Sequence, residues 1–429
     1  MRSAFVVMGL AAIGLTGCAS GSSGAPVAQA SDDLVARARV IHQRVITVDT
    51  HDDIPGNFAT PEVDPLNYPR QVNLEKMKAG GLDVAFFAVF VGQGPRTPEG
   101  NERAKTAAME KFNAIHRLAE SMYPDRIGIA YTPDDVTRLH TAGKLVAAIG
   151  IENGYVIGED LSLIEKYYDL GARYMTLAHT RNNDICDSST DSTAEHHGVS
   201  AFGKKVVAEM NRVGIMVDIS HVSRDCMLQA TAMSTSPVIA SHSSTTAEAN
   251  VPRNLDDEQL RAIAKNGGVA QMVALGDYVR APDPRRRAAQ DSLRQALGIT
   301  GGRGGGGGGG GRGGRGGQPM SPEDSARAAR FQQGTAAIDA RFPRPTVKDF
   351  VDHIDHAVKV AGIDHVGISS DFDGGGGIVG WSDASESFNL TLELVRRGYT
   401  EEQIRKLWGG NVLRVWAENQ RRATRGTKA

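Results

Sequence analysis

The sequence predicts an α/β fold, a (β/α)8 barrel of parallel strands with helices between them. Short apolar runs recur along the chain, and amphipathic stretches separate most of them. The runs are nearly continuous in apolar residues, as expected for parallel strands that are covered by helices on one side and filled on the other. The expected strands lie near residues 45–50, 83–91, 145–152, 173–179, 214–221, 237–242, 267–274 and 365–371.

Polar side chains stand at the carboxyl ends of several runs, which is where a (β/α)8 barrel builds its active site. The first run, Val45–Asp53, leads into His51 and Asp53. These two residues point to the same side of an extended segment, so both can reach one ion. The set as a whole combines imidazoles and carboxylates, which suit zinc. The later runs end on Glu152, His179, His221, His242 and Asp371.

Helices are expected where apolar residues recur at helical spacing. The final stretch, 401–418, is expected to be a closing pair of helices interrupted at Gly409-Gly410. The other clear amphipathic stretches are 101–122, 203–213 and 347–360.

Four further histidines are not expected to bind metal. His353 and His356 fall on the more polar flank of the helix expected at 347–360, which predicts helix-surface histidines. His196 and His197 lie in a polar stretch without a strand before it, and are interpreted as solvated loop residues.

Length and charge limit the classes of function. A chain of 429 residues could hold two or three domains, but one barrel of about 250 residues with insertions also fits. Lysine and arginine number 48 against 50 aspartate and glutamate. This balance gives no electrostatic reason to expect nucleic acid or an anionic membrane surface as a partner.

The first 18 residues resemble a bacterial lipoprotein signal peptide. Arg2 precedes the apolar stretch Ala4–Leu15, and Leu15-Thr16-Gly17-Cys18 resembles a lipobox, in which Cys18 is acylated. An ordinary secretory signal, or a buried helix with an incidental cysteine, is the alternative. Residues 19–31 are expected to form a flexible tether. The protein is therefore expected to be exported and lipid-anchored to a bacterial membrane, on the periplasmic or cell-surface side.

An insertion interrupts the barrel pattern between the last two expected strands. It contains the run Arg285–Arg287 and the glycine tract Gly301–Gly317, and it is expected to be disordered over about 283–335. An arginine–glycine nucleic-acid segment is the alternative. The tract has no aromatic residue to stack on bases, so a flexible surface insertion is favoured.

Two cysteines, Cys186 and Cys226, remain after the signal peptide. Both follow neighbouring expected strands, and an exported compartment permits a disulfide. Two isolated cysteines do not establish one, so the pairing stays open.

The ordered motifs resemble the renal (membrane) dipeptidase family, peptidase family M19, which comprises zinc peptidases with a barrel of the metal-dependent amidohydrolase type. The resemblance runs from about Val45 to Trp416 without the glycine-rich insertion, within a barrel domain expected at 32–422 and followed by a tail at 423–429. The motifs are VDTHDDIP (48–55), GIENG (150–154), RYMTLAH (173–179), GIMVDISHVS (214–223), PVIASHSS (237–244), PRN (252–254), HVGISSDFDG (365–374) and GGNVLRVW (409–416).

The resemblance implies a binuclear zinc site. His51 and Asp53 would hold one ion, His221 and His242 the other, and Glu152 would bridge the two. A carboxylate has two oxygens to share, and two divalent ions lower the pKa of a bound water to near neutrality. A metal-bound hydroxide would then hydrolyse the peptide bond of a dipeptide.

The resemblance also implies the residues that handle the substrate. His179 would stabilise the oxyanion, Arg253 would bind the C-terminal carboxylate, and Asp371 would move a proton to the leaving amine. Locally, Asp371 could also be a structural carboxylate and Arg253 a surface salt-bridge partner. One departure follows Glu152, because Tyr155 stands where the renal enzyme has a histidine.

Two other functions stay open at the level of sequence. A related amidohydrolase would act on other amides or on a β-lactam ring, and a catalytically silent lipoprotein would keep the barrel as a binding module. No G-x-S-x-G or H-E-x-x-H motif supports another hydrolase design. The sequence also leaves open the preferred side chains, the tolerance of D-residues and whether the protein is a homodimer.

Overall fold

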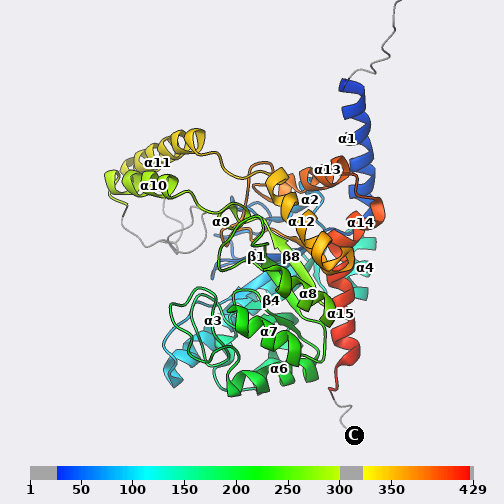
Figure 1. Cartoon of the computed structure of the whole chain (residues 1–429), viewed down its shortest axis with the longest axis vertical. Helices are drawn as coiled ribbons and strands as arrows, with labels where there is room; N and C mark the ends of the chain where they lie inside the picture. The colour runs from blue at the N-terminus through cyan, green and yellow to red at the C-terminus, as the bar shows by residue number, and fades with distance from the viewer. Residues whose placement is uncertain (1–26, 300–321, 426–429) are drawn as a thin grey trace, which may run out of the picture.

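Parallel strands form a barrel surrounded by helices in the computed structural model, which describes residues 27–299 and 322–425 (Figure 1). The strands follow the order β1-β2-β4-β5-β6-β7-β8-β9, and each neighbouring pair is parallel. The barrel closes between β9 and β1, where the amide of Asp53 donates to the carbonyl oxygen of Phe372 at 2.9 Å. The strands are β1 (Val48–Asp53), β2 (Val84–Phe90), β3 (Ile127–Ile129), β4 (Leu145–Glu152), β5 (Ala172–Thr176), β6 (Met216–Asp218), β7 (Ile239–Ser243), β8 (Val269–Val273) and β9 (Val366–Ser369).

Helices and short helical turns connect and cover these strands. The α-helices are α1 (Val27–Arg44), α2 (Leu74–Gly80), α3 (Pro98–Arg117), α4 (Pro133–Thr141), α5 (Ser162–Asp169), α6 (Ala201–Val213), α7 (Arg224–Met233), α8 (Asp257–Asn266), α9 (Gly276–Val279), α10 (Pro284–Ala296), α11 (Pro322–Arg341), α12 (Val347–Ala361), α13 (Phe388–Arg396), α14 (Glu401–Arg405) and α15 (Asn411–Arg422). The turns are η1 (Leu118–Met122), η2 (Gly154–Ile157), η3 (Ile363–His365), η4 (Ala384–Glu386) and η5 (Lys406–Gly410).

The predicted (β/α)8 barrel is confirmed. All eight expected strands are present, and the additional strand β3 pairs only with β4, outside the main order. Its three residues are too few to give an apolar run that stands out in the sequence.

The prediction that the last two helices are interrupted at Gly409-Gly410 is wrong. The chain continues helically from α14 through η5, a π-helical turn, into α15. A Cβ added at Gly409 would lie 2.6 Å from the carbonyl oxygen of Ile46. The glycine therefore permits a close approach of this helix to the chain just before β1.

The half of the barrel away from the polar strand ends is filled by apolar side chains. Val48, Phe86 and Tyr174 belong to one buried cluster that also includes Val412 and Trp416 of α15. The ring of Phe86 stacks on Tyr174 and meets Trp416 edge-on, with centroids 5.6 and 5.8 Å apart. Because α15 seals this half, polar groups inside the barrel gather at the carboxyl ends of the strands.

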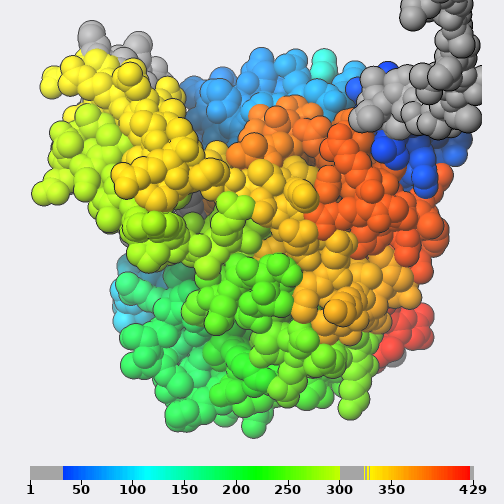
Figure 2. Space-filling model, turned by 45° about the horizontal axis from the view of Figure 1, so that its top comes forward, coloured from blue at the N-terminus to red at the C-terminus, as the bar shows by residue number. Residues whose placement is uncertain are grey.

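The insertion is partly helical, so the prediction of disorder is wrong for 284–296 and 322–335. Helices α10 and α11 pack on each other and project from one side of the barrel (Figures 1 and 2). Arg286 pairs with Asp339 at 2.7 Å. A Cβ added at Gly334 would meet Leu293 at 2.5 Å, so the two helices approach closely there. The glycine tract Gly301–Gly317 lies outside the described residues.

The ends of the chain differ partly from expectation. Helix α1 begins at Val27, inside the tether predicted for 19–31. The predicted signal peptide and Cys18 lie outside the described residues, and none of the helices described is long and apolar enough to cross a membrane. At the other end, Arg425 of the predicted tail pairs with Asp169 at 2.6 Å.

Three of the histidines that were not expected to bind metal can be compared with the structure. His353 is buried rather than on the helix surface: Nδ1 accepts from the amide of Thr245 at 3.0 Å, and Nε2 donates to the carbonyl oxygen of Val279 at 2.9 Å. It therefore ties α12 to the segments after β7 and β8. His356 is half-buried beside Asp257, and His197 is exposed as expected.

The two remaining cysteines are free. Cys186 and Cys226 are both buried, and burial raises the pKa of the Cys226 thiol, with the neighbouring Cys186 adding to the effect. The Cys226 thiol therefore stays protonated at neutral pH.

Candidate active site and metal centre

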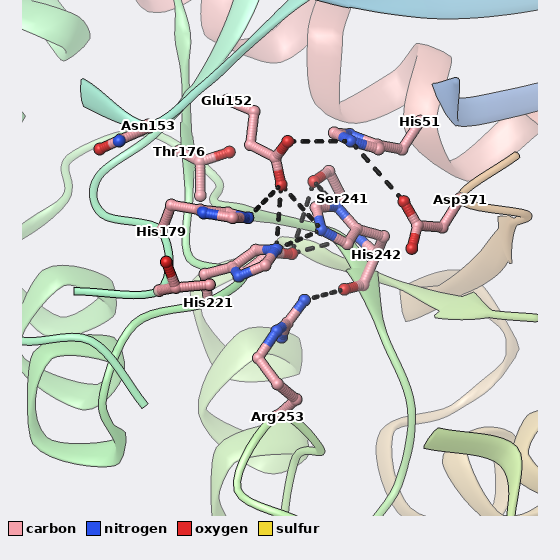
Figure 3. A network of polar contacts seen from close by, with 12 residues as sticks. His51, Glu152, Asn153, Thr176, His179, His221, Ser241, His242, Arg253 and Asp371 are labelled. Atoms are coloured by element: carbon pink, nitrogen blue, oxygen red, sulfur yellow. Dashed lines mark hydrogen bonds and ion pairs between the residues drawn. The ribbon is translucent and has the colours of Figure 1, made fainter. Parts of the chain in front are cut away.

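The predicted site residues converge at the carboxyl end of the barrel (Figure 3). They come from strands far apart in sequence, and in the figure Arg253 reaches the histidine cluster from the side away from Glu152. Figure 3 shows His51 of β1, Glu152 of β4, His179 after β5, His221 after β6, His242 of β7, Arg253 in the following loop and Asp371 after β9. Asp53 of β1 belongs to the same cluster, with Oδ2 4.0 Å from Nε2 of His51.

Glu152 lies at the centre and faces the imidazoles with both of its oxygens. Oε2 is 3.5 Å from Nε2 of His51. Oε1 is 3.0 Å from Nε2 of His221, 3.4 Å from Nε2 of His179 and 3.5 Å from Nε2 of His242. A carboxylate that divides its oxygens between two groups of imidazoles has the geometry of a bridging ligand.

The ring of His51 is oriented by a tyrosine beneath the site. Tyr174 donates its hydroxyl proton to the carbonyl oxygen of Thr50 at 3.0 Å. Its phenol oxygen therefore accepts from Nδ1 of His51, 2.9 Å away. Nε2 of His51 faces Glu152 instead, and it is buried and has no hydrogen-bond partner among the described residues. A nitrogen left in this way is ready to bind a cation.

The ring of His242 is oriented by a similar chain. The hydroxyl of Ser241 donates to Oδ2 of Asp218 at 2.7 Å, so its oxygen accepts from Nδ1 of His242 at 2.8 Å. The lone pair of His242 is then on Nε2, which lies 2.7 Å from Nε2 of His221. Two ring nitrogens at this distance need a proton or a metal ion between them or beside them, because their lone pairs repel.

Burial and the neighbouring carboxylates together decide which histidines of the site are charged. Burial lowers the pKa of both His221 and His242 well below the usual range of histidine, so both rings are neutral at pH 7. Burial also lowers the pKa of His51, but Glu152, Asp53 and Asp371 outweigh it and raise that pKa to about 10. A proton held so firmly by surrounding carboxylates marks a position where a metal cation would be equally favoured.

Among the described residues, three overlapping groups of side chains could hold a metal ion. In each group, ligand atoms lie within 4.8 Å of one another. The residues present fit a two-metal site, since they combine neutral imidazoles, buried carboxylates and an unpartnered buried nitrogen. The groups also include His179 and Asp371, which the resemblance assigns to the substrate. The groups are His51, Glu152 and His242; Glu152, His179 and His221; and His51, Asp53 and Asp371.

Left-handed backbone positions aim two of the site residues. His221 has φ 66° and Asp371 has φ 58°, a region that non-glycine residues seldom adopt. The turn at Asp371 is held by the amide of Gly376, which donates to the carbonyl oxygen of Asp371 at 2.7 Å. A Cβ added at Gly376 would lie 1.9 Å from the carbonyl oxygen of Ser370, so this tight turn needs a glycine.

Arg253 is buried in the site without a counter-ion. Its side chain donates to the carbonyl oxygen of His242 at 3.0 Å and to the hydroxyl of Ser243 at 3.3 Å. Only 4% of the residue is exposed, and no carboxylate of the described residues lies within ion-pair distance. Arg253 is therefore not a surface salt-bridge partner. A buried guanidinium without a carboxylate is costly unless a ligand supplies the charge.

Two aromatic residues at the site were not predicted from the sequence. The guanidinium of Arg253 lies over the ring of Tyr278, 5.3 Å from its centroid. The ring of Phe90, the last residue of β2, lies 4.7 Å from that of His179. Tyr278 follows an expected strand, but an aromatic side chain is not a metal ligand, so the sequence carries no signal for either residue. Tyr155, the departure noted above, is buried and donates its hydroxyl proton to the carbonyl oxygen of Pro95 at 2.7 Å.

Comparison with models of protein families identifies the family to which this barrel belongs. The model of the membrane dipeptidase family, peptidase family M19, matches residues 35–428. The chain belongs to the membrane dipeptidase family. The predicted resemblance and enzyme class are thereby confirmed.

Relatives of this family member cover most of its length. It is similar to the probable dipeptidase PvdM from Pseudomonas aeruginosa, with 32% identity, a TM-score of 0.76, and 91% of this chain and 100% of that chain covered. The dipeptidase verJ from Clonostachys rogersoniana is 29% identical over 401 residues, which is 90% of this chain and 87% of the relative. A structure described as dipeptidase AC, a metallo peptidase of family M19, shares the fold, with 23% identity, 87% of this chain and 99% of that chain covered, and a TM-score of 0.66.

Proposed function

We propose that this member of the family is a zinc-dependent dipeptidase that hydrolyses the peptide bond of dipeptides. The observation that carries the proposal is Glu152, whose two oxygens face imidazoles on opposite sides of a buried centre. His51 and Asp53 would hold one zinc ion, His221 and His242 the second, and Glu152 would join them. When bound, such a pair of ions acidifies a water molecule and polarises the carbonyl that is attacked.

Arg253 selects the substrate in this proposal. A dipeptide carries a free carboxylate one residue beyond the bond that is cleaved. The planar guanidinium can bind that carboxylate through two parallel hydrogen bonds, because no carboxylate of the described residues forms an ion pair with it. A longer peptide has an amide at that position and loses this contact.

His179 and Asp371 handle charge and protons. Burial lowers the pKa of His179, so the neutral ring donates a hydrogen bond to the carbonyl oxygen as negative charge develops there. Burial raises the pKa of Asp371 well above its ordinary value. The shift favours the protonated carboxyl group, which suits a residue that delivers a proton to the leaving amine.

A substrate panel tests this function. The zinc-loaded protein is assayed on L-Ala-L-Ala, L-Ala-D-Ala, the amidated dipeptide, a tripeptide and a β-lactam. We expect turnover of free dipeptides and little turnover of the amidated dipeptide and the tripeptide. Preferential opening of the β-lactam would favour the related amidohydrolase, and no turnover of any compound by zinc-loaded protein would favour a binding module.

We also propose that the protein is exported and anchored to a bacterial membrane through acylated Cys18. The support is the apolar stretch before Leu15-Thr16-Gly17-Cys18 in the sequence. In bacterial cells, wild-type protein should partition into the detergent phase and take up labelled fatty acid, whereas Cys18→Ser should do neither. Equal partitioning of the two proteins would contradict the anchor.

A further inference from the structure

Lys111 brings a positive charge to the edge of the candidate active site. It is in the second half of α3, and its ammonium nitrogen lies over the ring of Phe90, 5.6 Å from the centroid. Phe90 ends β2 and packs against His179 on the site side. The charge is therefore one aromatic ring away from a residue that faces the substrate.

The ammonium of Lys111 has no anionic partner of its own. No carboxylate of the described residues lies within 4.0 Å of it, although the side chain is partly buried. Lys105, six residues earlier on the same helix, pairs instead with Glu102 at 3.2 Å. Holding a cation away from water without a partner is unfavourable, so the position calls for an explanation.

One explanation is that Lys111 balances the carboxylates of the site. Burial lowers its pKa, while Asp53 and Glu152 act in the opposite direction, so the three charges do interact. In the metal-loaded protein, the bound ions would neutralise Asp53 and Glu152, so these carboxylates would no longer balance the charge of Lys111. The charge of Lys111 would be neutralised best by an anion that arrives with the substrate.

The position of Lys111 indicates which part of the substrate would carry that anion. Arg253 is beside His242, at the end of the site where the C-terminal carboxylate would bind. Lys111 lies over Phe90, whose ring packs against His179, whereas Arg253 is held by the carbonyl oxygen of a different histidine, His242. A dipeptide bound by its carboxylate at Arg253 would therefore extend the side chain of its N-terminal residue toward Phe90.

We propose that Lys111 and Phe90 form a specificity subsite for an acidic side chain on the N-terminal residue of the dipeptide. The ring of Phe90 contacts the methylene groups of aspartate or glutamate, and the ammonium of Lys111 pairs with the carboxylate. The inference rests on the proposed dipeptidase function and adds a substrate class to it.

The test compares matched dipeptides on the full-length, zinc-loaded protein. Glu-Ala and Gln-Ala differ in charge alone, so the ratio of their kcat/KM values isolates the contribution of Lys111. We expect a ratio of about ten or more for the wild type, as a partly buried ion pair gives. Lys111→Met should bring the ratio close to one, mainly through KM for Glu-Ala. Lys111→Arg should keep the preference, and Lys111→Glu should shift it toward Lys-Ala.

The controls separate this inference from the proposed function. Lys105→Met removes a lysine from the same helix outside the site and should leave the ratio unchanged. Zinc content measured on every variant shows whether the metal centre is intact. The ratio of kcat/KM for Glu-Ala and Gln-Ala in the wild type tests the subsite independently of any variant. A wild-type ratio near one, or a ratio unaffected in zinc-loaded Lys111→Met, would overturn the subsite. Failure of the wild type on every dipeptide would overturn the dipeptidase function instead.

Discussion

Individual residues of the site depend on partners that hold them in one orientation. Tyr174 and Ser241 each accept a hydrogen bond from Nδ1 of a histidine, so Nε2 is the ring nitrogen that faces the centre. Such partners take no part in the reaction, but they fix both the tautomer and the orientation of a ligand ring. The metal affinity of the site should therefore respond to residues that never touch the metal.

Tyr174→Phe tests this dependence. The variant loses the acceptor for Nδ1 of His51, so we expect zinc affinity to fall about 10–100-fold. Competition with a chromogenic chelator measures the affinity directly. Tyr167→Phe is the control, because Tyr167 is also buried and donates to the carbonyl oxygen of Val156 at 3.0 Å, away from the metal ligands. If both variants bind zinc equally well, the orientation of His51 does not depend on Tyr174.

Arg253→Ala tests the carboxylate contact. Loss of a charge-assisted bidentate contact should reduce transition-state binding by on the order of 2–4 kcal/mol for a free dipeptide. The discrimination between free and amidated C-termini should shrink, and zinc content should stay intact because arginine is not a ligand. Arg224→Ala, an exposed arginine paired with Asp256 and Glu258, should change neither. An unaltered preference for the free carboxylate would show that another group binds it.

At the scale of elements, the sequence predicts the strands well because each one is a continuous apolar run. The metal-ligand candidates were visible for the same reason: a histidine or carboxylate directly after such a run stands out. Residues that act through shape rather than charge were not visible. Phe90 looks like the end of an apolar strand, and nothing local indicates that His353 is buried between distant segments.

The insertion shows a second limit of the sequence. Glycine density dominates its composition and predicts disorder, yet α10 and α11 flank the tract. Both contain many helix-favouring residues, and each stabilises the other through Arg286 and Asp339 and through the close contact of Leu293 with Gly334. Pairing of two marginal helices is a tertiary effect that composition does not report.

Deletion of Gly301–Gly317 tests the independence of the insertion from the site. Because α10 and α11 contact each other and project from the barrel, we expect zinc content and dipeptide turnover to remain nearly unchanged. Inductively coupled plasma analysis and a dipeptide assay provide the two readouts. A severalfold loss of turnover at full zinc content would mean that the deleted tract influences substrate access.

In the whole molecule, the residues that stabilise the barrel and the residues of the candidate site lie in different halves of the barrel. Apolar residues and α15 fill one half, and the polar residues gather at the other. Strands distant in sequence therefore deliver seven ionisable side chains and one arginine to a single centre. The proposed dipeptidase function requires two metal ions to be held around Glu152 at this centre.

Zinc titration of the metal-free protein tests that claim most directly. Dipeptide hydrolysis should be absent after chelation and should rise with added zinc until about two ions are bound per chain. Glu152→Gln should weaken the binding of both ions, because its two oxygens face different imidazoles. Full hydrolytic activity in protein shown by elemental analysis to be free of metal would contradict the account.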